Sequence, residues 1–161
     1  MSLSSTCYDP IIRFGRQALS EVERHEAVPA MEMCARSVIL SAGLVSLMAD
    51  DNYNCALAHA VCYGLQHFEH VEREYLHGDL VAYGALVQLA VDGQLDKARE
   101  LRAFLVSLGT PVTLAQMRVS LEKTALHDAL IEATTGPDMA HIPYPVTQDM
   151  VFDAMQRVET L

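Results

Sequence analysis

The chain has 161 residues, of which 51% are hydrophobic and 20% are charged, and its formal net charge is −10. This length and hydrophobic content exclude a disordered chain and suffice for one domain with a sizeable core. The acidic balance argues against a nucleic-acid-binding protein, which needs a basic face. The four cysteines form no C-x-x-C pair and no secretory leader is visible, so we expect reduced thiols and a cytoplasmic protein.

The N-terminal residues predict a short leader and then a helix. We expect residues 1–6 to be disordered. Asp9-Pro10 then supplies a capping residue and a proline at the first helical position. Apolar residues recur on one face from Ile11 to Val22, so the first helix is expected to cover this range.

A second helix is predicted from Pro29 to about Ala49. Its longest apolar run begins at Val38 and is interrupted by serine and glycine. The run is shorter than the roughly 20 apolar residues that a membrane span needs, so it predicts a buried helix. Residues 50–54 form a polar break after it.

The rest of the sequence also shows helical periodicity and helix-ending residues. Asp92-Gly93 and Gly109 with Pro111 are typical of turns and helix ends. Helices are expected at 55–71, 78–91, 95–108 and 121–135. A further short helix is expected after the capping box of Thr113 and Gln116, and a last helix after the capping residue Thr147. No segment alternates as a strand does, so the prediction is one all-α domain of about seven to eight helices over residues 1–161.

Two histidines, His59 and His77, are the first candidates for chemistry. Each is flanked by small residues near a predicted helix end, where two imidazoles could be directed at one metal ion. A divalent metal usually takes three or four protein ligands, so spacing alone also fits a core histidine plus a loop histidine.

Other groupings of ligand-type residues remain open. Cys55, His59 and Cys62 share one helical face and could form a zinc site, although buried cysteines are ordinary core residues. Glu74 and His77 match half of a di-iron carboxylate motif, which needs two such units. The remaining histidines have other expected roles. His67 and His70 are expected to face solvent on one helix side together with Glu74, and His25 and His127 are expected at the surface. His141 is expected to be a structural or site-lining residue.

Four blocks of sequence carry a resemblance to a known family. They are Ala56–Ala60 with Gly64-Leu65, His77–Gly84 with Leu86–Leu89, Gly109–Ala115, and His141–Thr147. From Tyr8 to Leu161 the chain resembles the C-terminal helical domain of glycerol dehydrogenases, within the iron-containing alcohol dehydrogenase and dehydroquinate synthase-like superfamily.

The resemblance implies a function and a metal site. His59 and His77 match two metal ligands of the family, where Zn²⁺ or Fe²⁺ polarises the substrate hydroxyl and hydride passes to NAD. The implied protein is an NAD-dependent glycerol or polyol dehydrogenase. The family's third ligand, an aspartate, lies upstream of the matched region, and Asp50 or Asp51 is a possible substitute.

The chain also departs from the family pattern. No G-x-G-x-x-G turn is present, so NAD is expected to bind only if a nucleotide-binding domain is supplied. We expect a truncated chain or the product of a shortened gene, inactive alone. Residues 50–54 stand where the family has a Gly-rich segment, and Cys62-Tyr63 stands where the family usually has His-Asn. We therefore expect either a different substrate preference or a degenerate site.

The alternative is a non-catalytic helical domain. A surface that faces the nucleotide-binding domain in the intact relatives would expose apolar groups, and such patches are usually covered by a partner. This predicts a homo-oligomer, or docking to a separate nucleotide-binding chain.

Overall fold

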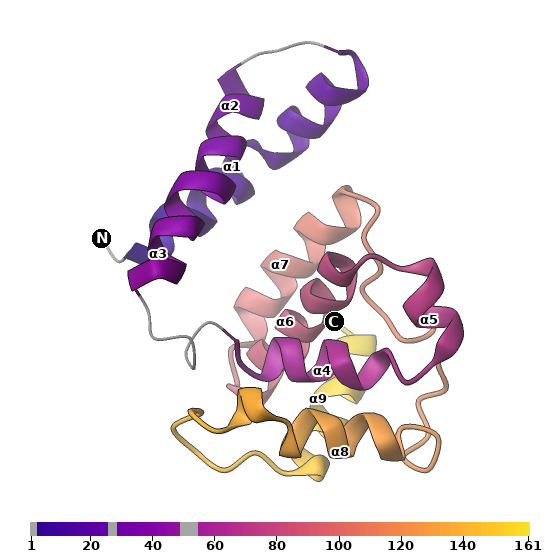
Figure 1. Ribbon diagram of the computed structural model, residues 1–161. Helices are drawn as coiled ribbons and strands as arrows, with labels where there is room; N and C mark the ends of the chain where they lie inside the picture. The colour runs from indigo at the N-terminus through magenta and orange to yellow at the C-terminus, as the bar shows by residue number, and fades with distance from the viewer. Residues whose placement is uncertain (1–2, 26–28, 49–54) are drawn as a thin grey trace. The chain divides into compact units, whose positions relative to one another are not determined.

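The computed structural model describes residues 3–25, 29–48 and 55–161 (Figure 1). Within these ranges every regular element is helical, which confirms the all-α prediction. The chain divides into two compact units, residues 1–54 and 55–161, where the sequence suggested one domain. Each unit is described by itself.

The first unit is built from α1 (Leu3–Glu23), α2 (Pro29–Arg36) and α3 (Ala42–Met48). A π-helical turn, η1 (Ser37–Ser41), joins α2 to α3 without a break, and α1 packs along the resulting helical run. The prediction of a disordered leader over residues 1–6 is wrong for residues 3–6, because α1 begins at Leu3.

Pro10 lies inside α1 and not at its start, contrary to the prediction. A proline has no N–H, so Pro10 cannot donate the helical hydrogen bond to the carbonyl four residues earlier, that of Thr6. The Oγ of the buried Ser37 lies 2.6 Å from the Cys7 carbonyl oxygen, to which its hydroxyl donates, and 3.3 Å from that of Thr6. This contact joins the neighbouring helical run to α1 in the turn that precedes the proline.

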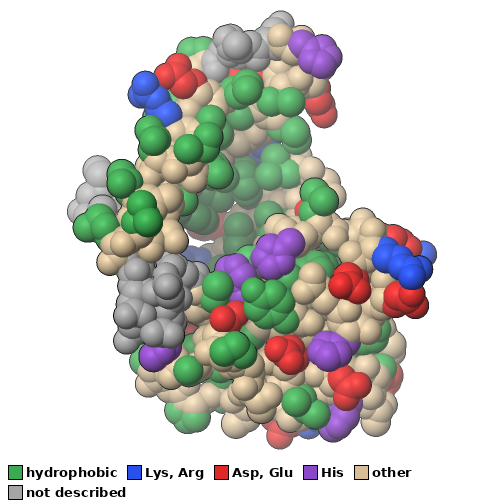
Figure 2. All heavy atoms as spheres, in the orientation of Figure 1, with side chains coloured by type: hydrophobic (Ala, Val, Ile, Leu, Met, Phe, Trp, Pro, Cys, Tyr) green, Lys and Arg blue, Asp and Glu red, His purple; other side chains and the backbone are tan. Residues whose placement is uncertain are grey.

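The predicted burial of the second helix is wrong. Of the run Pro29–Met48, only Ala30 and Ser37 are buried. Hydrophobic side chains gather over this unit in Figure 2. Those of the run that are more than half exposed are Val38, Ile39, Leu40, Leu44, Leu47 and Met48.

The same helical run meets the length and composition of a membrane span. It has 20 residues, with a mean hydropathy of 1.4. Length and composition alone are weak support for a span, and the run also carries an ion pair between Glu32 and Arg36, at 3.1 Å.

The second unit is organised around α4 (Leu57–Leu65) and α6 (His77–Val91), which pack against each other. α8 (His127–Thr135) covers α4, while α7 (Leu95–Ser107) and α9 (Gln148–Glu159) pack on α6. A short helix, α5 (Glu69–Glu74), follows α4, and a 3₁₀ turn, η3 (Pro137–Met139), contacts α4. The largest fully buried side chains of this core include Leu57, Leu65, Leu80, Tyr83, Leu86, Leu114, Met117, Leu126, Leu130 and Met155.

Two glycines set the close approach of the helices. A Cβ atom at Gly84 of α6 would lie 2.2 Å from the Ala58 carbonyl oxygen of α4. A Cβ atom at Gly64 would lie 2.5 Å from the Ala129 carbonyl oxygen of α8. Only glycine permits these backbone-to-backbone contacts, so the positions of α4, α6 and α8 depend on them.

Side chains satisfy the first amides of the helices that carry the candidate site. The Ala58 amide donates to Gln88 Oε1 at 3.1 Å, and the Leu76 amide donates to Asp79 Oδ2 at 3.2 Å. These bonds fix the N-terminal ends of α4 and α6, where backbone N–H groups lack helical partners.

Three predicted helices differ from the structure. The helix predicted over 55–71 is interrupted after Leu65, and Phe68 is extended before α5 begins. The helix predicted over 121–135 begins only at His127. The capping contact of Gln116 with Thr113 forms at 3.1 Å, but residues 114–118 are a turn and not a helix.

Candidate metal centre

The structure brings His59 and His77 together. His59 lies in the first turn of α4 and His77 is the first residue of α6. Their ring centroids are 5.7 Å apart, with an interplanar angle of 44°. With Zn–N bonds of about 2.0–2.1 Å and tetrahedral angles, two coordinating imidazole rings have centroids roughly 5–6 Å apart. The separation of the two rings lies within this range.

Tyr63 completes a group of three rings. It follows His59 by one turn of α4, and its ring centroid lies 6.4 Å from that of His59 and 6.0 Å from that of His77. Its side chain is partly exposed. Burial raises the pKa of the phenol, and the nearby Asp138 carboxylate adds to this effect, so Tyr63 is a neutral hydroxyl at physiological pH.

Cys62 contacts His77 from the buried side. Its Sγ lies 3.4 Å from Nδ1 of His77 and 3.8 Å from the carbonyl oxygen of the same residue. The side chain is completely buried, and burial raises the pKa of the thiol to about 11. Cys62 is therefore a protonated thiol at neutral pH.

The surroundings of His59 favour its neutral form. Burial lowers the pKa of the imidazole, the neighbouring His77 lowers it further, and Asp138 opposes both effects. A neutral imidazole is the form that binds metals. Asp138 lies on η3, and its Oδ2 atom is buried without a hydrogen-bond partner in the part of the chain that the structure describes.

Within the described residues, the two imidazoles are joined by no further side chain of a metal-binding type. Among residues 3–25, 29–48 and 55–161, no three His, Cys, Asp or Glu side chains are close enough to hold a metal ion together. The alternative zinc site of Cys55, His59 and Cys62 is therefore not formed there. The suggested substitutes Asp50 and Asp51 lie outside the described residues.

The other candidate residues have different roles. Glu74 pairs with Arg118, which places it in a surface ion pair and not in a di-iron motif. His70 was expected to face solvent, but its Nε2 lies 3.1 Å from the Met117 carbonyl oxygen. Apart from His77, the histidines that are exposed are His25, His67, His127 and His141.

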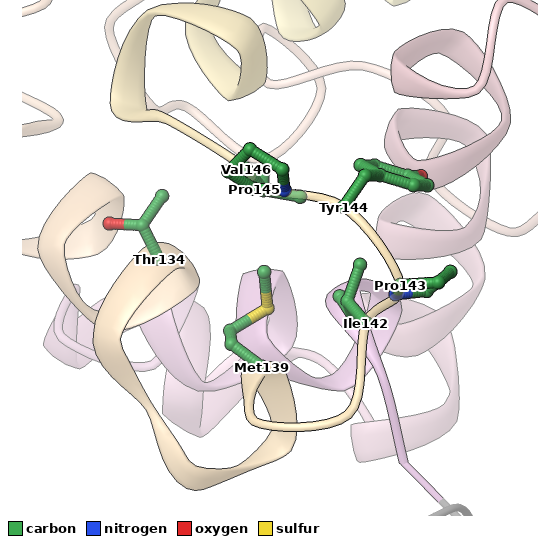
Figure 3. A pocket seen from close by; sticks show the side chains of 7 residues that line it. All are labelled: Thr134, Met139, Ile142, Pro143, Tyr144, Pro145 and Val146. Carbon is green, nitrogen blue, oxygen red and sulfur yellow. The ribbon is translucent and has the colours of Figure 1, made fainter.

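A pocket of about 470 Å³ lies beside the segment 142–146 (Figure 3). It is lined by Thr134, Met139, Ile142, Pro143, Tyr144, Pro145 and Val146. No His, Cys, Asp or Glu side chain lines it, and the one phenol is held by a hydrogen bond to Asp92, which raises the pKa of Tyr144 to about 12. This pocket lacks the groups that metal chemistry requires.

Comparisons with known proteins find several dehydrogenases to which this chain is similar, although no protein-family model matches it. Hydroxycarboxylate dehydrogenase A of Escherichia coli is 31% identical over 154 residues, which are 94% of this chain and 42% of that protein. Glycerol dehydrogenase of Thermotoga maritima is 29% identical over 163 residues, 98% of this chain and 43% of that protein.

Solved structures agree with these relatives. A probable glycerol dehydrogenase from Sinorhizobium meliloti 1021 superposes with a TM-score of 0.84 at 26% identity, covering 98% of this chain and 44% of that one. Glycerol dehydrogenase from Schizosaccharomyces pombe has the same TM-score at 23% identity and shares the fold. The chain thus spans less than half the length of these proteins.

Proposed function

The chain is homologous to part of the glycerol dehydrogenases of the iron-containing alcohol dehydrogenase-like superfamily, and from this relationship we propose that it forms the metal-binding wall of a dehydrogenase active site. The proposed substrate is a small alcohol or polyol. His59 and His77 hold Zn²⁺ or Fe²⁺, and the 5.7 Å separation of their rings is the observation that supports this assignment.

The chain's own residues account for binding and orientation. The imidazoles of His59 and His77 would each offer one nitrogen lone pair to the cation, which leaves further coordination positions for a third ligand and for the substrate oxygen. When bound, the cation supplies Lewis acidity to the substrate hydroxyl. Tyr63, half exposed beside both rings, forms a wall that restricts the size of the substrate.

The acceptor in the proposed reaction is NAD, bound by a nucleotide-binding domain. The sequence has no glycine-rich turn of the G-x-G-x-x-G type, so NAD binding is proposed only where such a domain accompanies this chain. A cytoplasmic location fits a nicotinamide-dependent reaction and remains part of the proposal.

Zinc titration tests the metal site. We expect protein purified without added metal to bind about one Zn²⁺ per chain with a Kd in the micromolar range or tighter, as imidazole sites do. The measurements are metal content by mass spectrometry and the heat of zinc binding by isothermal titration calorimetry. The absence of both metal and heat would mean that the two histidines do not form a working site.

A second candidate function is self-association through the exposed helical run of the first unit. Six apolar residues between Val38 and Met48 are more than half exposed, whereas soluble monomers rarely display a large contiguous apolar patch. The proposed partner is a second copy of this chain.

We expect the protein to elute as a dimer or larger at about 50 μM, because burying this apolar surface is favourable. The variant with Ile39→Lys and Leu47→Lys should become a monomer, since these side chains are 70% and 85% exposed. Light scattering after size exclusion measures the mass. Val106→Lys, at a 52% exposed position of α7, is the matched control and should keep the wild-type mass. A monomeric wild-type protein would contradict the prediction.

A further inference from the structure

One buried thiol contacts the same histidine twice. Cys62 lies on the buried side of α4, and its sulfur reaches both the ring nitrogen Nδ1 and the carbonyl oxygen of His77. His77 itself is exposed, so one edge of its ring meets the sulfur while the rest is accessible. Position 62 is also one at which this sequence differs from the family pattern, which the resemblance gives as a histidine.

The single hydrogen of the Cys62 thiol limits how the sulfur can bond to both the carbonyl oxygen and Nδ1 of His77. A thiol has one proton to donate, and a carbonyl oxygen can only accept. The contact with the His77 carbonyl is therefore a hydrogen bond only if the thiol donates its proton there. The sulfur lone pair then faces Nδ1, and that contact is a hydrogen bond only if Nδ1 carries a hydrogen. The two contacts can both be hydrogen bonds only in this one arrangement.

We propose that Cys62 is a positioning residue that holds His77 in the Nδ1–H tautomer and so leaves the Nε2 lone pair free for the metal. The opposite tautomer places the hydrogen on Nε2 and blocks that nitrogen. Metal-binding histidines usually donate their second ring N–H to a carboxylate or a carbonyl, which fixes tautomer and ring orientation. Here a buried thiol takes that place. The inference rests on the proposed metal site for its function, but the tautomer is a property of the metal-free protein.

Nitrogen NMR of the metal-free protein tests the tautomer directly. Long-range ¹H–¹⁵N correlation spectra distinguish a protonated from an unprotonated ring nitrogen. We expect His77 of the wild-type protein to be protonated at Nδ1. In Cys62→Ala we expect the Nε2–H form to become populated and zinc affinity to fall about 10-fold or more, the usual effect of losing such a partner.

Two further variants separate positioning from packing. Cys62→Ser keeps one donor and one acceptor and should retain the Nδ1–H tautomer. Cys55→Ala removes a thiol just before α4 and should leave the His77 spectrum and zinc affinity at wild-type values. An Nε2–H tautomer in the wild-type protein, or an unchanged His77 spectrum in Cys62→Ala, would overturn the proposal. A wild-type protein with the Nδ1–H tautomer and no heat of zinc binding would instead support the role of Cys62 and contradict the metal site.

Discussion

Replacing Gly84 with alanine is expected to destabilise the second unit by about 3 kcal/mol or more, at the upper end of overpacking changes. The added Cβ would lie 2.2 Å from the carbonyl oxygen, 2.9 Å from the carbonyl carbon and 3.0 Å from the Cα of Ala58. All three are backbone atoms, so no side-chain rotation can relieve the contact. α4 and α6 must move apart, and His59 and His77 would lose the ring separation on which the proposed metal site depends.

Urea unfolding followed by far-ultraviolet circular dichroism measures this loss. Gly43→Ala is the matched control, because Gly43 also lies within a helix and its Cβ would meet nothing within 4 Å. Alanine is the better helix former by up to about 1 kcal/mol, so the control should be neutral or more stable. An unfolding midpoint of Gly84→Ala equal to that of the wild-type protein would contradict the packing described for these helices.

Loss of either imidazole is expected to abolish stabilisation by zinc. A ligand that binds only the folded state at 100 times its Kd adds about 2.7 kcal/mol to the free energy of unfolding. For a chain of this size, that raises Tm by roughly 5–10 °C. His59→Ala and His77→Ala should show no such rise, because one imidazole cannot hold the ion alone.

Thermal melts with and without zinc provide the measurement. His127→Ala removes an exposed histidine at the start of α8 and should keep the full wild-type rise. If either ligand variant still gained the wild-type increase in Tm, zinc would be binding elsewhere on the chain.

The convergence of the two histidines could be predicted from the sequence, since the motifs around them resemble a known family. The contact of Cys62 with His77 could not. Helical spacing grouped Cys62 with Cys55 and His59 on one face of the helix predicted over residues 55–71. In the structure α6 packs against α4, and the Cys62 sulfur lies against His77. Which neighbour a side chain meets is decided by the partner helix, and periodicity carries no information about it.

In the segment after Thr113, the predicted capping contact forms but the predicted helix does not. The Thr113 hydroxyl caps the Gln116 amide as expected, yet Arg118 adopts a positive φ of 56° and ends the turn. The Leu114 amide donates to the Glu159 carboxylate of α9 at 2.6 Å, a contact from 45 residues away. Pro10 shows the reverse case, because α1 already begins at Leu3 and continues through the position where the local rule predicts its start.

The crowding around α4 limits which substitutions in this helix could change the preference for the proposed alcohol substrate. Most of its side chains are buried, the Ala58 backbone is occupied by Gln88 and Gly84, and His59 belongs to the candidate metal centre. Tyr63 is the position of this helix that lies beside both imidazoles and is still open to solvent. Tolerated diversity along α4 should therefore concentrate at this one position, and a library aimed at new alcohols is best randomised there.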